Sequence, residues 1–563
     1  MPLKPGGEPP QALAAARDLA WTGQHAQAIE CCGHALAARQ ITPAQRMDLL
    51  DLRAESLIAE GRFADAAHDA AAMLSLARAH KQSTLEVRAL NRHALVLMRR
   101  GQIKPALDVA TRAVALARKA RNGALLAHSL LCLGEAQFRA TQNNAAIASG
   151  KNAARLFEAA GDTLGVGRAH WVVAFAHSRL AQGAPSRAAA QRAAELARET
   201  GDEQGLANAL NVLSFGCTDI AERIAVLQQG AQACERSGYA YGRALVKSNL
   251  SLAFAELGLY RHACRLGEEL MVQSERAGAR QALAFQMSSL IGWKSALGEA
   301  QSARARWTEY DALVTALDEP ATRNLRWLDG SALALAEGDS ATAVKGLRAA
   351  LRELGQAKSG HELRTLVALA KALLVAGDAA AALRISQRAA RLHRAQDFAR
   401  AGLGQSQDIW WWHSRALAAN GRPEESWTAL QRAHTLLLDA VRNVRDEGLR
   451  RSYLNKVEVN RDIVRAWLRE SARRKLPDAQ RLEHLAIQSG LGEPFKRLVD
   501  TGMRLNELRS AQELQDFLID EVTELSGAER VLLLLETPGE VQIAGALLPA
   551  GEDARALLHA ITP

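Results

Sequence analysis

Apolar residues recur at helical spacing through most of this chain, in long stretches that are separated by short polar turns. The stretch 83–100, for example, carries Leu85, Leu90 and Met98 on one face and is interrupted by Gly101. Apolar residues three and four positions apart form one buried stripe on a helix. Each pair of stretches therefore predicts two antiparallel helices, helix A and helix B, joined by a tight turn.

The turns are marked by a glycine that is followed five residues later by a small residue. The pairs are Gly23/Ala28, Gly61/Ala66, Gly101/Ala106, Gly183/Ala188, Gly258/Ala263, Gly298/Ala303, Gly338/Ala343, Gly377/Ala382 and Gly421/Ser426. Successive glycines lie 38, 40, 82, 75, 40, 40, 39 and 44 residues apart. These gaps correspond to one or two repeat lengths of about forty residues, and a period of about 20–50 residues is typical of stacked repeats. Glycine suits the end of helix A because it adopts the left-handed conformation.

A second small residue lies seven positions before most of the turn glycines. The positions are Ala16, Ala54, Ala94, Ala176, Ser251, Ser331, Ala370 and Ser414. Two further units lack the turn glycine. One centres on Thr141, with Gly134 and Ala146 in register, and the other centres near Ile220, with Leu213 where a small residue is expected. The sequence thus predicts about eleven helical hairpins.

This three-point pattern of small residue, turn glycine and small residue resembles the tetratricopeptide repeat (TPR). The resemblance covers residues 10–446 and implies an all-α, right-handed TPR-like α-solenoid, preceded by a disordered N-terminus at 1–9. The period exceeds the usual TPR length of about 34 residues, which implies longer helices. Such repeats mostly present binding surfaces rather than catalytic sites.

The pattern changes beyond the repeats. Residues 447–505 carry helical patterns with a modest basic excess, which favours a helical stalk or linker with solvated charged faces; a docking surface is the alternative. The apolar runs 530–536 and 541–548, separated by a turn signal, predict a β-hairpin. A helix that ends at Leu525 and leads into this hairpin resembles the start of a GAF domain. That resemblance implies a small, incomplete α/β module at 506–563.

The order of repeats, stalk and GAF-like start resembles the regulatory half of bacterial TPR/GAF adenylate/guanylate cyclases, and sensor histidine kinases share such parts. The resemblance implies a regulatory scaffold in signal transduction that couples partner binding to an output outside this chain. It carries over no catalytic residue, so no enzymatic activity is expected of the chain itself. A transcription-regulator-like repeat domain is a further alternative. The resemblance also allows a homodimer through the stalk and the GAF region.

Composition narrows the possible partners and cellular compartment only slightly. The formal charge of +9 comes from 70 basic and 61 acidic residues that are spread along the chain, which does not by itself indicate nucleic-acid binding. The six cysteines show no metal-like or disulfide-like spacing, and no signal peptide or membrane-length apolar run is evident. We therefore expect a cytoplasmic protein whose partner is a protein or peptide, with no nucleic acid and no membrane.

No motif indicates a cofactor, a metal or a catalytic centre. The sequence at 149–152 has Lys151 of a phosphate loop but lacks the first glycine and the magnesium-binding hydroxyl. His170 and His177 lie two helical turns apart, roughly 10 Å, which is too far to share one metal ion.

Candidate binding residues come from the register of helix A, which lines the concave surface of such arrays. The register places the following residues in the groove: Arg88, Asn91, Arg92, His128, Glu135, His170, His177, Asn211 and Asn249. In the TPR family, asparagines at the positions of Asn211 and Asn249 contact the main chain of a bound peptide; simple solvation of a polar face is the alternative. The three consecutive tryptophans at 410–412 cannot all face one core, so Trp411 is a further binding candidate, with core packing as the alternative.

Overall fold

The computed structural model describes residues 9–38, 41–180, 182–217, 219–276, 280–317, 320–354, 361–395, 405–444, 446–485, 510–526, 528, 530–537, 540–548 and 552–561. The chain divides into two compact units, and each is described by itself. Unit 1 comprises residues 1–218 and 222–250, and unit 2 comprises residues 219–221 and 251–563.

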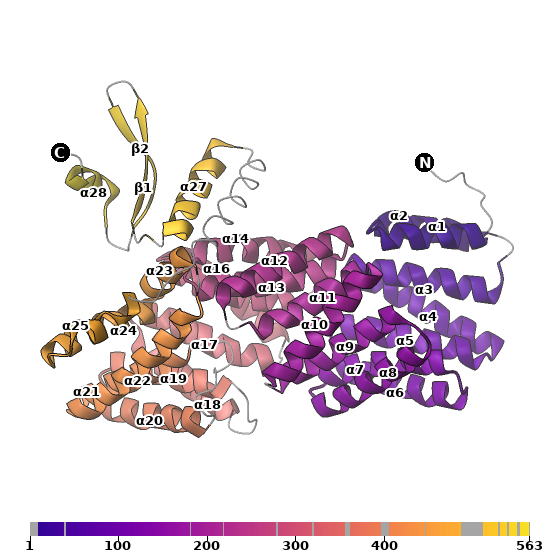
Figure 1. The fold of residues 1–563 in the computed structure, drawn as a ribbon, viewed down its shortest axis with the longest axis horizontal. Helices are drawn as coiled ribbons and strands as arrows, with labels where there is room; N and C mark the ends of the chain where they lie inside the picture. Colours follow the sequence, from indigo (N-terminus) through magenta and orange to yellow (C-terminus); the bar gives the residue numbers. More distant parts are fainter. Residues whose placement is uncertain are drawn as a thin grey trace. The chain divides into compact units, whose positions relative to one another are not determined.

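Unit 1 is built from helices that alternate in direction (Figure 1). They are α1 (Pro9–Trp21), α2 (His25–Leu36), α3 (Pro43–Ala59), α4 (Phe63–His80), α5 (Ser83–Arg99), α6 (Ile103–Lys119), α7 (Gly123–Arg139), α8 (Asn143–Ala159), α9 (Thr163–Arg179), α10 (Gly183–Thr200) and α11 (Glu203–Phe215). Two helices include the boundary between the units, α12 (Ile220–Arg236) and α13 (Ala240–Glu256).

Unit 2 continues the alternation and ends in a small α/β part. Its helices are α14 (Tyr260–Arg276), α15 (Arg280–Ala296), α16 (Ala300–Leu317), α17 (Pro320–Ala336), α18 (Ser340–Leu354), α19 (His361–Val375), α20 (Ala379–Ala395), α21 (Ser406–Ala419), α22 (Pro423–Arg442), α23 (Glu447–Asn455), α24 (Glu458–Arg473), α25 (Asp478–Arg481), η1 (Glu483–Leu485), α27 (Ala511–Ser526) and α28 (Ala554–Ile561), and its strands are β1 (Val531–Thr537) and β2 (Glu540–Leu547). The pairs from α1/α2 to α21/α22 make eleven helical hairpins, which confirms the predicted all-α repeat architecture.

The predicted turn glycines adopt the left-handed conformation. Positive φ angles of 68° to 84° are found at Gly23, Gly61, Gly101, Gly258, Gly298, Gly338, Gly377 and Gly421. At Gly61 the amide donates to the carbonyl of Ile58, and the next amide, of Arg62, donates to Leu57. This pattern is the Schellman ending, which satisfies the last carbonyls of helix A. The small residues five positions after these glycines are fully buried from Ala28 to Ala382, so helix B packs closely on helix A as predicted.

The prediction was wrong in the unit of Gly183. That glycine is the first residue of α10, with Gln182 as the N-cap, so it lies inside helix B and not at the end of helix A. The close-packed position of helix B is therefore Ser186, which is buried and donates from Oγ to the carbonyl of Ala174 at 2.9 Å. Ala188, the residue predicted for this role, is exposed.

The two units without a turn glycine differ in outcome. Thr141 has a φ of 63°, so it occupies the glycine position as predicted, although it is not a glycine. In the other unit α11 ends at Phe215 and Ile220 is the first residue of α12, so the predicted centre of the turn is the start of helix B.

Consecutive A helices touch one another directly. Contacts join α1 to α3, α3 to α5, α5 to α7, α7 to α9 and α9 to α11 in unit 1, and α15 to α17, α17 to α19 and α19 to α21 in unit 2. In the described residues no comparable contact joins consecutive B helices. Because the A helices lie closer together than the B helices, each row of hairpins curves with the A helices on its inner, concave side.

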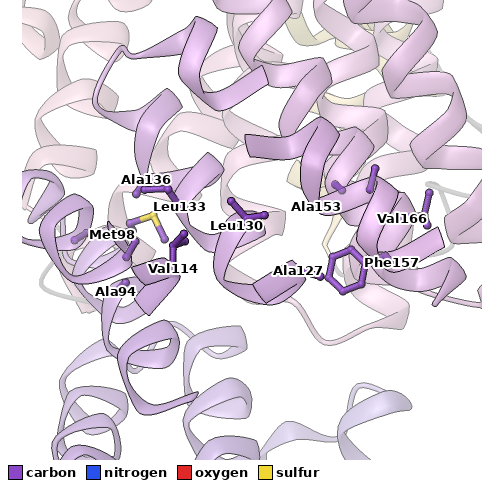
Figure 2. Packing of buried hydrophobic residues seen from close by; sticks show 14 of the residues in the cluster. Ala94, Met98, Val114, Ala127, Leu130, Leu133, Ala136, Ala153, Phe157 and Val166 are labelled. Carbon is purple, nitrogen blue, oxygen red and sulfur yellow. The ribbon is translucent and has the colours of Figure 1, made fainter. Parts of the chain in front are cut away.

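The core is a thin apolar layer between neighbouring helices. One cluster runs through α5–α10 and combines bulky residues such as Met98, Val114 and Phe157 with fully buried alanines. Figure 2 shows these large side chains among Ala94, Ala127 and Ala153. An alanine opposite a large side chain lets two helices interdigitate without voids, which explains the high alanine content of the repeats.

Unit 1 also contains contacts between segments far apart in the sequence. The turn of the first hairpin meets the loop between α12 and α13, where Gly23 and Gly238 lie in main-chain contact. His25 Nε2 lies 2.9 Å from the carbonyl oxygen of Ser237, and both residues are buried. We call this contact between the first and sixth hairpins the closing contact of unit 1.

The start of α13 extends the closing contact. The ring of Tyr241 meets Phe63 edge-on at 5.6 Å, and the guanidinium of Arg99 lies 5.2 Å from the centroid of the same ring. Burial raises the pKa of the neighbouring Tyr239 to about 12. Tyr241 therefore joins the start of α13 to the turn sides of the second and third hairpins.

Unit 2 has an equivalent contact at Gly258, the turn between α13 and α14. A Cβ atom at this position would lie 2.6 Å from the Cβ of Lys456. Ser452 Oγ donates to the carbonyl of Leu257 at 2.9 Å and is fully buried. The loop between α23 and α24 therefore packs on the turn of the seventh hairpin, although about two hundred residues separate them.

Residues 447–476 bury much of their surface, contrary to the expectation of a solvated stalk. Helix α24 packs on α21 and α22, and Trp467 lies in a stack with Trp427 and His434. The Trp427 and Trp467 rings are 5.1 Å apart at 11°, and the His434 and Trp467 rings are 4.0 Å apart at 8°. Arg474 covers the outer face of Trp427 at 5.0 Å and pairs with Glu424. Residues 486–505 of the predicted stalk and residues 506–509 of the predicted GAF-like module lie outside the described residues.

The stack makes the attachment of α24 sensitive to acid. Burial lowers the pKa of His434 from 6.5 to about 3, so the unfolded chain binds a proton below pH 6.5 that the folded chain does not. Stability contributed by the neutral ring is present above pH 6.5 and falls as the pH decreases, by about 1.4 kcal/mol per unit. We expect unit 2 to lose about 2 kcal/mol between pH 7 and pH 5 from this group.

The comparison of His434→Phe with the parent chain in urea denaturation at both pH values checks this expectation. Phenylalanine keeps the stack and removes the titrating group, so its loss of stability on acidification should be smaller by about 2 kcal/mol. An equal loss in both proteins would assign the acid sensitivity to other groups, such as His413 or His484.

The C-terminal part confirms the predicted β-hairpin. Strands β1 and β2 pair antiparallel, with Val531 opposite Leu547 and an irregularity between Leu533 and Leu534. Helix α27 lies against this hairpin, where Ile519 contacts Gly545. The same helix touches α23, and its Asp520 pairs with Arg265 of α14 at 3.4 Å.

Candidate functional site

The inner face of unit 1 carries a network of charged side chains between α3 and α5. Arg88 contacts Asp48 at 2.8 Å and Asp51 at 3.3 Å, and Arg92 contacts Asp51 at 2.6 Å and Glu55 at 3.2 Å. Although burial opposes ionisation, the guanidinium groups of Arg92 and Arg88 lower the pKa of Asp51. The two predicted arginines are thus brought together by carboxylates of the preceding A helix.

A second pair links α5 to α7. Glu135 accepts from Arg99 at 2.5 Å and from Arg139 at 2.9 Å, and its side chain is only 9% exposed. Although burial opposes ionisation, the two guanidinium groups lower the pKa of Glu135 to about 2. Glu135 is therefore a charged structural link beside the closing contact, with little surface left for a ligand.

Asn91 and His128 each keep hydrogen-bonding capacity that the neighbouring side chains do not use. Asn91 Nδ2 donates to Ser129 Oγ at 3.1 Å, whereas its Oδ1 is buried and has no hydrogen-bond donor among the described residues. His128 is exposed, and its ring lies edge-on to Phe157 at 5.0 Å. Partial removal of its imidazole from water lowers the pKa of His128. Its ring is therefore neutral near pH 7 and can either donate or accept a hydrogen bond.

The network continues along α9, α11 and α13. Arg168 binds Asp202 at 2.9 and 3.3 Å, and Asn249 Nδ2 donates to Asn211 Oδ1 at 2.7 Å. Asn211 and Asn249 therefore bond to each other in this structure. His170 and His177 are half-buried on α9, and His177 Nδ1 lies 2.6 Å from the Gln182 amide oxygen. Burial lowers the pKa of His170.

Sequence reasoning missed several members of this network, among them Asp48, Asp51, Glu55, Arg168 and Asp202. A signal for one of them exists, because Asp51 precedes its turn glycine by ten residues, as Asn91 does. Extending the register of helix A to the second hairpin would have placed Asp51 on the inner face. Asp202 could not be found in this way, because it caps the start of α11 and lies outside the repeat register.

The three tryptophans lie in unit 2 and are mostly buried. Trp410 and Trp411 are each 4% exposed, and Trp412 is half-buried beneath the ammonium group of Lys371 at 5.3 Å. Trp410 Nε1 donates to His393 at 3.0 Å, while Trp411 Nε1 has no hydrogen-bond partner in the described part of the chain. Trp411 is therefore a core residue of α21 in this structure, and Trp412 is the more accessible ring.

Other kinds of site find no support in the described residues. No three His, Cys, Asp or Glu side chains there are grouped as metal ligands. Across the same residues, no helix combines the length and the apolar character needed to span a bilayer. The inner face of the A helices is thus the polar surface that the structure assembles from several repeats.

No family model matches the chain, and no curated protein matches it significantly. Among solved structures it is similar to the apo form of RapI, with 13% identity and a TM-score of 0.42 over 68% of this chain and 97% of that one. It is also similar to a Rap protein complexed with competence and sporulation factor, with 14% identity and a TM-score of 0.41 over 74% of this chain and 99% of that one. A third similar structure is the apo form of the quorum sensor NprR from B. thuringiensis, with 12% identity and a TM-score of 0.41 over 60% of this chain and 99% of that one. With TM-scores below 0.5, these likenesses carry no argument about the function of this chain.

Proposed function

We propose that the inner face of the A helices in unit 1 binds a peptide or a protein segment and that the chain is a regulatory scaffold. The main support is the polar row that runs from α3 to α11 across consecutive, directly contacting A helices and reaches α13 through the hydrogen bond between Asn249 and Asn211. Repeat arrays typically bind extended partners on such a surface. Half-exposed Glu55 and Arg88 offer charge of both signs.

The unpaired amide oxygen of Asn91 gives this proposal a specific contact, which requires the side chain to rotate toward the groove because Oδ1 is buried. A buried acceptor without a donor costs about 1–3 kcal/mol, and a ligand that supplies an N–H group to the rotated side chain recovers part of that cost. A peptide main chain provides such donors at regular intervals. Neutral His128, on the next A helix, adds a group that can donate or accept.

A selection from displayed random peptides on the immobilised whole chain tests the proposal, followed by calorimetric titration of the enriched peptide. We expect Asn91→Leu and Glu55→Gln each to weaken its binding about tenfold. Glu195→Gln on the outer helix α10, where the side chain is 61% exposed, is the control and should leave binding unchanged. Failure to enrich any peptide, or equal effects of the inner and outer variants, would contradict the proposal.

We further infer that binding is coupled to the C-terminal part, and that the parent protein is a signalling protein such as a nucleotide cyclase or a histidine kinase. This inference rests on the resemblance of residues 506–563 to the start of a GAF domain and on the contacts of α27 with α23 and Arg265. Limited trypsin digestion with the selected peptide addresses the coupling. An unchanged cleavage pattern around α27 would argue against it.

A further inference from the structure

A groove separates the consecutive B helices α18 and α20 in unit 2. Its volume is about 650 Å³, within the range of about 300–1,000 Å³ that ligand sites occupy. Leu369 and Leu373 of α19 contribute to its lining between the two helices. Val344, Leu351 and Ile385 line it from α18 and α20. The groove is therefore largely apolar and lies on the side of the hairpins opposite to the inner face.

Four cations line the same groove: Lys345, Arg348, Arg352 and Arg384. All four are exposed, no carboxylate lines the groove with them, and none forms an ion pair with a described residue. By contrast, Arg388 on α20 is paired with Glu362. The groove thus combines apolar surface with positive charge that the described chain leaves uncompensated.

Three of the cations form a row along α18, and the fourth faces them from α20. Lys345, Arg348 and Arg352 follow one another at spacings of three and four residues, so they lie on one face of α18 over about 10 Å. Arg384 lies on the opposite wall. A ligand with a single anionic group would meet one or two of these cations. Neutralising the row on α18 together with Arg384 requires several negative charges along an elongated ligand.

The walls also restrict the conformation of that ligand. Amides and carbonyls within α18 and α20 are bonded inside their own helices, so the groove offers little main-chain pairing to an extended strand. A helical ligand satisfies its own main chain and presents one apolar stripe to the groove, as in other helix-in-groove complexes. Carboxylates on both sides of that stripe would meet the row on α18 and Arg384 on α20.

We propose that the groove between α18 and α20 binds an acidic amphipathic α-helix of a protein partner. Residues such as Leu351 and Ile385 contact the apolar stripe of that helix. The row of cations on α18 and Arg384 on α20 orient it and exclude basic or neutral helices. This surface is independent of the inner face of unit 1.

Fluorescence anisotropy with the whole chain tests the proposal. The probe is a labelled synthetic peptide with leucine at i, i+3, i+4 and i+7 and glutamate on both flanks of that stripe. The companion peptide carries glutamine in place of glutamate. The test variant is the charge reversal Arg348→Glu/Arg384→Glu, at exposed positions. The matched control is Arg391→Glu, which changes an exposed arginine of α20 outside the groove.

We expect the acidic peptide to bind, the double variant to weaken binding at least about tenfold, and the control to change it less than about twofold. Added salt should weaken binding, since the charges are exposed. A dissociation constant above about 1 mM, equal binding of the glutamine peptide, or equal losses in the test and control variants would overturn the proposal. Displacement of the peptide by phosphatidylglycerol vesicles but not by unlabelled peptide would assign the groove to a membrane surface instead. Circular dichroism of each variant verifies that the fold is retained.

Discussion

Gly23→Ala is expected to destabilise unit 1 by about 2–5 kcal/mol, through two effects that add at this turn. The residue has a φ of 79°, and a side chain in the left-handed conformation costs about 1–2 kcal/mol. In addition, a Cβ atom there would lie 2.7 Å from the carbonyl oxygen of Arg236 and 2.8 Å from the amide nitrogen of Gly238. These are main-chain atoms that cannot rotate away, and overpacking of this kind typically costs about 1–3 kcal/mol.

Gly61→Ala is the matched control. Its φ of 80° is nearly the same, but no heavy atom lies within 4 Å of the added Cβ position. The control should therefore show only the conformational cost of about 1–2 kcal/mol. Differential scanning calorimetry of the three proteins measures the difference. Equal shifts of the melting temperature for Gly23→Ala and Gly61→Ala would show that the closing contact of unit 1 does not exist in solution.

Trp467→Ala is expected to destabilise the end of unit 2 by about 3–5 kcal/mol. The side chain is 6% exposed, and its ring stacks with the rings of Trp427 and His434, at centroid distances of 5.1 and 4.0 Å. Its removal therefore leaves a large cavity. Because Trp467 is the largest buried side chain of α24, we expect this helix to detach before the rest of the unit unfolds.

Urea denaturation followed by tryptophan fluorescence measures this effect. Trp467→Phe is the control, because phenylalanine keeps an aromatic ring in the stack and should cost no more than about 1.5 kcal/mol. A loss below about 1 kcal/mol for the alanine variant would mean that α24 is held by other contacts, such as the pairing of Arg474 with Glu424.

The repeat architecture could be predicted from the sequence because each turn carries its own local signal. A residue with positive φ is normally glycine, and a close contact between two helices requires a small side chain, so Gly61 and Ala66 identify their hairpin without reference to the rest of the chain. The fifth hairpin has no glycine at its turn, and using the nearby Gly183 instead shifted the predicted register by two residues, from Ser186 to Ala188.

The binding residues could be assigned to a face but not to their partners. The register places Arg92 on the inner side of α5, yet its pairing with Asp51, which is 41 residues away, depends on the distance between two A helices. The stacking of Trp467 on Trp427 likewise depends on how α24 lies against α22, and the sequence pattern of charged residues in α24 does not show that this helix is packed. For Trp411, the rotation of α21 decides which of three adjacent rings is buried, and no single-sequence pattern fixes that rotation.

The contact of Gly23 and His25 with the loop at 237–238 has a consequence for how the protein opens. In an array where each repeat touches only its neighbours, the first hairpin frays independently of the others. Here α1 and α2 are also held by the sixth hairpin, so their amides should exchange with solvent only when both segments separate. The N-terminal repeat then belongs to one cooperative opening unit with α12 and the start of α13, although more than two hundred residues of chain lie between them.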